Sequence, residues 1–302
     1  MNKIVFFNDI FDINEGSWSG AIRCSQVYHI LKKYKEYNID CTTNLNNIIN
    51  SYIICVKDNN QLNLEKLKLM KNNNNKIIFD ILDYYDDNTS DIPDIIKNKF
   101  INYIDIFIVN NNFMKNEFKK YNKPVYVIPH HYDIRLNNKS MKKLDTLKFI
   151  FNGYVGYTNQ NCLYIKELKE KYNLLLCDEF NNFCNNFLAS NYCFISIRRE
   201  GSWEYNNRPI MKLAHAAACD SNIIITNDMS VRDLLDPSYP YLLKNHEYET
   251  VLEMMEYVKK TFETKIWYKG LEIIKELKNK LKIEKVVDDY WIPMIKKIKI
   301  KN

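Results

Sequence analysis

The fold class is decided by the stretch RPIMKLAHAAACDSNIIITN, residues 208–227. Pro209 suits the first turn of a helix, and the apolar spacing after it predicts a helix over residues 209–218. A short, β-branched apolar run follows at residues 222–226 and is typical of a buried strand. A helix that leads directly into a buried strand is the unit from which parallel α/β sheets are built.

The same alternation extends from this stretch in both directions. Apolar runs of strand length occur at residues 3–7, 39–42, 52–56, 76–79, 105–109, 125–128, 147–151, 174–177, 192–197 and 222–226. Helical patterns occupy residues 21–37, 64–71, 93–103, 113–121, 160–172, 209–218, 248–262, 267–282 and 286–299. Because strands and helices alternate regularly, we expect parallel sheets that are covered by helices on both faces.

The alternation breaks at residues 132–145, which are polar, basic and without periodicity. A length of 302 residues is comfortable for two domains. We therefore expect an α/β protein of two Rossmann-like domains that face a central cleft: a first domain over 1–132, a linker over 133–146 and a second domain over 147–284. A helix over 285–302, kinked or broken by Pro293, is expected to pack back on the first domain. Ligands bind such sheets outside the carboxyl ends of the strands.

Composition and charge exclude several classes of function. No apolar run approaches the roughly 18–20 residues of a membrane helix, and the first residues resemble a strand more than a signal peptide, so we expect a cytoplasmic protein. The eight cysteines form no CxxC pair, which argues against a disulfide framework or a bound metal. The net charge of +6 comes from basic residues interleaved with acidic ones and does not predict nucleic-acid binding. The run KKIKIK at 296–301 is either a solvated helix end or a peripheral contact with an anionic membrane.

Glycine is scarce, with 6 in 302 residues, so it should occur mainly where backbone geometry requires it. Five of the six follow predicted strands: Gly16, Gly20, Gly153, Gly156 and Gly201. Such loops let a ligand approach the N–H groups of a helix N-terminus. We predict an acceptor or cleft loop at Gly16, Trp18 and Gly20 and a diphosphate-binding loop at Gly153 and Gly156, with plain tight turns as the alternative. Neither loop is a GxGxxG fingerprint and no P-loop is present, which removes the main support for an NAD or ATP fold.

The third glycine loop carries positive charge. Arg198 and Arg199 follow the predicted strand 192–197, and Lys212 lies in the first turn of the next predicted helix. These cations would offset the charge of a nucleotide diphosphate, although ion pairing of the arginines with glutamates is the alternative interpretation. In the same region, Glu204 or His215 could hydrogen-bond ribose or sugar hydroxyls.

The candidate catalytic groups lie at strand ends in the first half of the chain. Asp80 and Asp83 follow the strand 76–79, as a base or a hydroxyl-binding carboxylate would. His130 and His131 end another strand, where an imidazole could act as a base near neutral pH. A hydrogen bond between the domains is an equal interpretation for these histidines. Trp18 and Trp203 could each stack on a sugar ring or base, or serve as a buried anchor.

At this point the chain resembles the GT-B glycosyltransferases of the group 1 (family 4) type. Residues 208–227 resemble the Pro-x-x-Lys-Leu helix, Gly-x-Pro turn and Val-Val-x-Thr strand of that family, and residues 105–110 and 124–133 resemble two motifs of its first domain. The family often carries a Glu-x7-Glu motif around the nucleotide sugar, and here Asn207 and His215 occupy those positions. Asp220 and Asn222 replace the usual Gly and Pro, and His131 replaces a glycine.

The resemblance implies transfer of a sugar from a nucleotide donor, UDP- or GDP-linked, to a glycan, lipid-linked or protein acceptor, without a metal or another cofactor. The donor diphosphate would be held by Arg198, Arg199, Lys212 and the Gly153–Gly156 loop. The first domain would supply the acceptor side, with Asp83, His130 or His131 as the catalytic group. Two alternatives stay open: a catalytically degenerate GT-B protein that binds glycans or partners, and a GT-B relative of another class such as a nucleotide-sugar epimerase.

Overall fold

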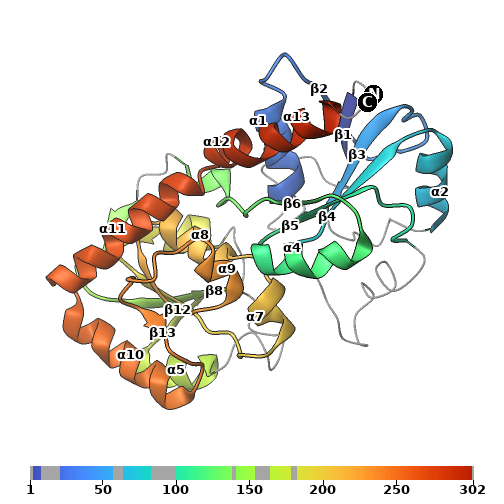
Figure 1. The fold of residues 1–302 in the computed structure, drawn as a ribbon. Coiled ribbons are helices and arrows are strands. Elements are labelled where there is room, and N and C mark those ends of the chain that lie inside the picture. Colours follow the sequence, from blue (N-terminus) through green and yellow to red (C-terminus); the bar gives the residue numbers. More distant parts are fainter. Residues whose placement is uncertain are drawn as a thin grey trace. The chain divides into compact units, whose positions relative to one another are not determined.

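The computed structural model describes residues 3–7, 21–56, 64–82, 100–137, 141–153, 164–177 and 182–300. The chain divides into two compact units (Figure 1). The first contains Met1–His130, Asn207–Pro209 and Ile283–Asn302, and the second contains His131–Asn206 and Ile210–Lys282. The end of the chain therefore belongs to the unit that contains its beginning.

The first unit is built on a parallel sheet of six strands in the order β2-β1-β3-β4-β5-β6. The strands are β1 Lys3–Phe7, β2 Asn38–Thr42, β3 Ser51–Val56, β4 Lys76–Asp80, β5 Ile106–Val109 and β6 Val125–Val127. All described strand pairs are parallel, and β1 lies between β2 and β3. The strands are nearly continuous apolar runs because both faces of the sheet are covered by helices.

Alternate side chains of these strands meet helices on opposite faces. Ile53, Ile77 and Phe107 pack with apolar residues of α2 (Leu64–Asn72) and α4 (Asn112–Phe118). On the other face, the Phe6 ring lies 5.7 Å from the ring of Trp291. Both layers of helix are therefore needed to bury this sheet.

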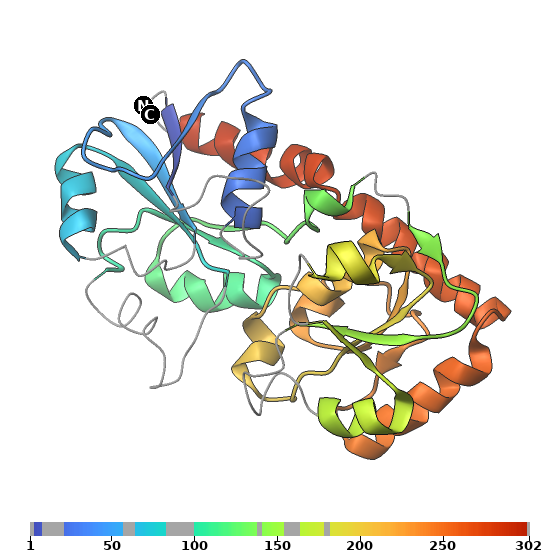
Figure 2. The ribbon, with the colours of Figure 1, turned by 180° about the vertical axis from the view of Figure 1, so that it is seen from behind.

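The C-terminal segment completes the second of those layers. It consists of α12 (Ile283–Val286), a π-helical stretch η5 (Val287–Trp291) and α13 (Ile292–Ile300). It lies beside α1 (Val27–Leu31), as Figure 2 shows. The hydroxyl of Tyr52 donates to the Ile298 carbonyl at 2.8 Å. The sequence predicts a kink or break at Pro293; the helix is not broken there, and the π-helical turn η5 ends two residues before this proline.

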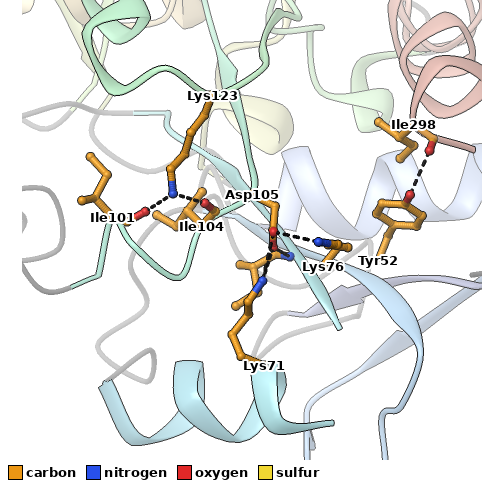
Figure 3. A network of polar contacts seen from close by, with 9 residues as sticks. Tyr52, Lys71, Lys76, Ile101, Ile104, Asp105, Lys123 and Ile298 are labelled. Atoms are coloured by element: carbon orange, nitrogen blue, oxygen red, sulfur yellow. Dashed lines mark hydrogen bonds and ion pairs between the residues drawn. The ribbon is translucent and has the colours of Figure 1, made fainter. Parts of the chain in front are cut away.

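Polar contacts fix the amino edge of the first sheet (Figure 3). The Asp105 carboxylate accepts from Lys71 at 2.8 and 2.9 Å and from the Ile77 amide at 2.8 Å, and Lys76 lies 3.4 Å away. Nearby, the Lys123 ammonium donates to the carbonyls of Ile101 and Ile104. Asp105 thus ties α2 to two strands, which neither the predicted strand 105–109 nor the likeness to a family motif had indicated.

The second unit has its own parallel sheet of five strands, in the order β13-β12-β11-β8-β9. The strands are β8 Phe149–Asn152, β9 Leu175–Cys177, β11 Cys193–Ser196, β12 Asn222–Thr226 and β13 Leu242–Leu243. Counted along the chain, both sheets contain the order 2-1-3-4-5 of doubly wound folds. This confirms the predicted fold class of two Rossmann-like α/β domains.

Helices of the second unit cover its sheet. They are α5 Ile165–Tyr172, η4 Phe183–Phe187, α7 Trp203–Asn207, α8 Met211–Ala218, α9 Met229–Arg232, α10 Tyr248–Thr261 and α11 Lys265–Lys280. Helix α11 packs against α8 and β12. Its Gly270 allows this approach, because a Cβ there would lie 2.5 Å from Asn222 Oδ1. Among the described residues, no helix is long and apolar enough to cross a membrane.

Two segments differ from the sequence-based expectation. The first helix does not extend over 21–37: it opens as a π-helix, η1 (Ala21–Gln26), and α1 ends at Leu31. The segment 133–146 belongs to the second unit. It contains the 3-10 turn η3 (Ile134–Leu136), capped by Asp133, and the strand β7 (Lys142–Lys143), which pairs with β10 (Ala189–Ser190). Its polar composition hid these short elements because they are fixed by pairing and capping and bury little apolar surface.

Candidate functional site

The second sheet has a topological switch point between β8 and β11, which are neighbours in the sheet although β9 and β10 separate them in the chain. From β8 the sheet order runs to β9 on one side, and from β11 it runs to β12 on the other. The loops after β8 and β11 therefore diverge, and ligands of doubly wound sheets bind in the crevice that results. Gly153 follows β8, and Arg198 follows β11.

Lys212 and Gly153 come together at this point. The Lys212 ammonium lies 4.8 Å from the centroid of the Phe151 ring, which belongs to β8. A Cβ on Gly153 would lie 3.1 Å from Cε and 3.2 Å from Nζ of Lys212. Glycine thus lets a half-buried cation rest against the backbone at the carboxyl end of β8. The structure brings together two residues that the sequence assigned separately to diphosphate binding.

His215 lies one turn further along α8, where its Nδ1 is 3.3 Å from the side-chain nitrogen of Asn152. The imidazole is 8% exposed. Burial, reinforced by the positive charges of Lys212 and Arg135, lowers the pKa of His215 to about 4, although Asp133 opposes this shift. His215 is therefore neutral at pH 7, and it can hydrogen-bond a hydroxyl without adding charge.

Arg198 forms a buried ion pair with Asp228, a residue that was not predicted to belong to the site. Its Nη1 lies 2.7 Å from Oδ2 of Asp228, and its backbone N–H donates to Thr226 Oγ1 at 3.2 Å. The Asp228 carboxylate also caps α9 by accepting from the Val231 amide at 3.0 Å. Burial raises the pKa of Asp228 and the Arg198 charge opposes that rise. The arginine thus has an ion-pair partner, as the alternative interpretation held, but the partner is an aspartate on the next strand's loop.

The neighbouring residues of the third loop border a small cavity. Arg199 is exposed, and the Glu200 amide donates to His246 Nδ1 at 3.3 Å. The Tyr205 hydroxyl donates to the Asn227 carbonyl at 2.8 Å. The cavity, of about 10 Å³, is lined by Arg198, Glu200, Tyr205, Thr226, Asn227, Leu243, Lys244, Asn245 and His246. Glu204 belongs to α7, and its side chain is not among those described.

The predicted catalytic groups of the first half are buried where the structure describes them. His130 is 1% exposed and His131 is 0% exposed. Asp80 is not a reachable base: its carboxylate lies 2.7 Å from Arg23 Nε in a fully buried ion pair. Asn110 holds the backbone beyond β4, because its Nδ2 donates to the Leu82 carbonyl at 2.6 Å.

The remaining predicted site residues lie outside the described parts of the chain: Gly16, Trp18, Gly20, Asp83 and Gly156. Their roles stay predictions, as do those of the two histidines. Within the described ranges, no group of three or more His, Cys, Asp and Glu side chains is arranged to hold a metal ion.

Asn152, Asp133, Asp228 and His246 belong to the site region but were not predicted as site residues. Asn152 could have been predicted as a site residue, because it ends a strand immediately before a glycine. Asp228 had another, because Asn-Asp-Met-Ser after a strand is a helix-cap pattern. Nothing in the sequence marks His246.

Comparison with solved structures gives one consistent fold. Sucrose-phosphate synthase from Thermosynechococcus elongatus matches with a TM-score of 0.66 at 8% identity, covering 100% of both chains. HepE from Anabaena in complex with UDP-glucose matches with a TM-score of 0.60 at 9% identity, covering 97% of this chain and 99% of that one. A glycosyltransferase from Rickettsia africae matches with a TM-score of 0.59 at 12% identity, covering 95% of this chain and 96% of that one. No protein-family model and no curated protein matches the sequence. The chain has the fold of the GT-B glycosyltransferases.

Proposed function

We propose that this protein transfers a sugar from a UDP- or GDP-linked donor to a hydroxyl of a glycan, lipid-linked or protein acceptor. The observation that carries the proposal is the Lys212 ammonium resting against the backbone of Gly153, beside the switch point of the second sheet. A cation at a backbone position without a side chain suits a diphosphate, which needs both charge and close approach.

The start of α8 adds to this positive potential. Lys212 is the second residue of the helix, and the preceding Ile210 has no side chain that could cap the first N–H groups. Helix N-termini favour anions for this reason. Lys212 and the helix end would together stabilise the diphosphate as the bond to the sugar breaks and negative charge grows on the leaving oxygen.

His215 suits recognition of the sugar or ribose. It lies on the same helix as Lys212, three residues further on, and it is neutral at pH 7 because of burial. A neutral imidazole beside Asn152 offers hydrogen bonds to hydroxyls. Glu204, Arg199 and Gly156 complete the proposed donor site, and Asp83, His130 or His131 the acceptor side. HepE from Anabaena, whose structure contains UDP-glucose, supports a nucleotide-sugar donor.

The proposal is tested by calorimetric titration of the purified protein with UDP and with GDP. Lys212→Ala should weaken binding by at least tenfold, since a charge-assisted hydrogen bond contributes about 1.5–3 kcal/mol. Lys212→Arg should retain part of the affinity, and Lys260→Ala, which removes an exposed lysine of α10, should leave it unchanged. Binding of neither nucleotide at millimolar concentration, or equal loss in the Lys260 variant, contradicts the proposal.

A catalytically degenerate protein is the second candidate, and one contact favours it. Arg198 is already paired with Asp228, so the donor site has one cation fewer available for a diphosphate than the sequence suggested. Nucleotide binding without release of free nucleotide from UDP- or GDP-sugars, with any acceptor tried, would favour this candidate. Conversion of the bound sugar to its epimer, again without nucleotide release, would instead indicate the epimerase alternative.

A further inference from the structure

The second unit contains a larger cavity away from the proposed donor site. It has a volume of about 400 Å³. Two of its lining residues, Ser190 and Asp220, lie three and two positions before the first residues of β11 and β12, so the cavity lies at the amino edge of the sheet. Lys212 lies at the start of α8, on the carboxyl edge, and Asp220 follows the end of that helix. The cavity volume falls within the range of about 300–1,000 Å³ that is usual for small-molecule sites.

The lining combines positive charge with hydrogen-bonding groups. Lys278 lies 2.8 Å from Asp220 in an ion pair, and a second lysine, Lys282, is exposed at the rim. Two cations and one carboxylate leave a net charge of +1 along the lining. The amides of Asn137 and Asn279 can donate to and accept from hydroxyl groups.

One wall of the cavity is apolar. Tyr132, Leu136 and Met141 line it; Tyr132 and Leu136 are 3% exposed and offer only a small, fixed surface, and Met141 is half-buried. A sugar ring presents an apolar C–H face together with hydroxyls, and an aromatic residue beside amide groups is suited to both. A free inorganic anion would use only the charged part of this lining.

We propose that this cavity is a second binding site, which takes a small sugar phosphate. Lys282 and Lys278 contact the phosphate, Asn137, Asn279 and Asp220 hydrogen-bond the sugar hydroxyls, and the Tyr132 wall packs against the ring. This site does not depend on the proposed transferase activity, because none of its residues belongs to the donor site.

The cavity is lined by residues from both places where the chain passes from one unit to the other. Tyr132 is the second residue after the chain leaves the first unit at His130, and Lys282 is the last residue before the chain returns to that unit at Ile283. These two passages are joined by a hydrogen bond from the Tyr132 amide to the Leu281 carbonyl, at 3.3 Å. A bound sugar phosphate contacts both passages and therefore slows the opening of this bond.

The experiment measures thermal unfolding and amide hydrogen exchange of the full chain with glucose 1-phosphate, inorganic phosphate and glucose as separate probes. Glucose 1-phosphate should raise the Tm and slow exchange at Tyr132. Both effects should be lost in Lys282→Gln and in Asn279→Trp, which fills the cavity. Both should be retained in Lys275→Gln, which changes an exposed lysine of α11, and in Lys212→Ala.

Several outcomes overturn the proposal. It fails if glucose 1-phosphate produces no shift at millimolar concentration, or if the shift is equal in Lys282→Gln. It fails as well if UDP or the Lys212→Ala change abolishes the shift, because the probe then occupies the donor site. A shift of equal size with inorganic phosphate alone refutes the assignment to a sugar phosphate. The unliganded Tm of each variant shows whether it is folded.

Discussion

Each unit has a buried arginine–aspartate pair at the carboxyl edge of its sheet, but the two pairs have different surroundings. In the first unit, Arg23 is 0% exposed, and its guanidinium donates to Asp80 and to the carbonyls of Ile128 and Pro129. The same guanidinium lies 5.4 Å from the Trp291 ring. In the second unit, Arg198 is 8% exposed, pairs with Asp228 and borders the small cavity after β11.

The difference shows how one pairing can serve two purposes. The Arg23 pair is inaccessible to solvent and links η1, β4 and the end of β6. Its role is therefore to stabilise the fold of the first unit. The Arg198 pair is followed by the exposed Arg199, and the same edge also carries the half-buried Lys212. The second edge thus keeps cations where an anion can reach them. This contrast leads to four expected outcomes.

The largest effect is expected from Arg23→Met. It leaves Asp80 buried without its partner, which typically costs about 3–5 kcal/mol. Urea denaturation followed by circular dichroism measures the free energy of unfolding. Lys3→Met is the control, because it removes an exposed ion pair with Asp40 and should change that free energy by less than about 1 kcal/mol. An equal decrease in the free energy of unfolding in the two variants would show that the buried Arg23 pair does not stabilise the fold more than an exposed ion pair does.

The next effect concerns pH and His215. Its pKa is about 4 in the folded protein and about 6.5 when unfolded, so only the unfolded chain takes up a proton between these values. The free energy of unfolding should therefore fall as pH drops from about 6.5 to 4, by up to about 3 kcal/mol. In His215→Gln this part of the pH dependence should be absent. Parallel curves for wild type and variant in this range would exclude a buried neutral imidazole.

A smaller loss of stability is expected from Arg198→Met. Asp228 keeps the hydrogen bond from the Val231 amide when the guanidinium is removed, and loss of a hydrogen bond to a charged group costs about 1.5–3 kcal/mol. Asp228→Asn should cost less, because the amide oxygen can still cap α9. The same urea experiment measures both changes. A loss for Arg198→Met as large as that for Arg23→Met would remove the distinction between the two pairs.

The last effect should appear in binding. Gly153 has a φ of +158°, which residues with a side chain rarely adopt, so the unliganded Tm of Gly153→Ala should fall as well. The Cβ of Gly153→Ala would press on the flexible end of Lys212 and displace its ammonium by a few tenths of an ångström. Under the proposed function, affinity for UDP or GDP should fall about fivefold, roughly 1 kcal/mol. Calorimetric titration measures the affinity. An unchanged affinity for UDP and GDP would show that Gly153 does not belong to the diphosphate site.

The fold was largely predictable from sequence because its strands are short apolar runs with distinct ends. The ranges 3–7 and 222–226 coincide with β1 and β12. The two-residue strands β7, β10 and β13 were missed because each depends on a pairing partner. The π-helical start of the first helix was also missed, since its residues read as an ordinary helical pattern.

The site was only partly predictable. Lys212 and Gly153 were chosen for separate reasons, and the structure places them in contact. The Arg198–Asp228 pair and the His215–Asn152 contact join residues that are 30 and 63 positions apart. Such contacts depend on strand order and helix packing, which local patterns do not specify. The sequence therefore could not show that Arg198 is ion-paired with Asp228 while Arg199 is exposed.

The C-terminal helices have a consequence for how the protein is made. Trp291 covers Phe6 and Arg23, and Ile298 accepts a hydrogen bond from Tyr52, so residues near the start of the chain need partners synthesised about 240 or more residues later. The second unit lies wholly between these partners, and it can form its sheet while the ribosome is still translating residues 283–300. During synthesis, the unit that begins first is therefore completed last, and one apolar face of its sheet stays uncovered until residues 283–300 are available.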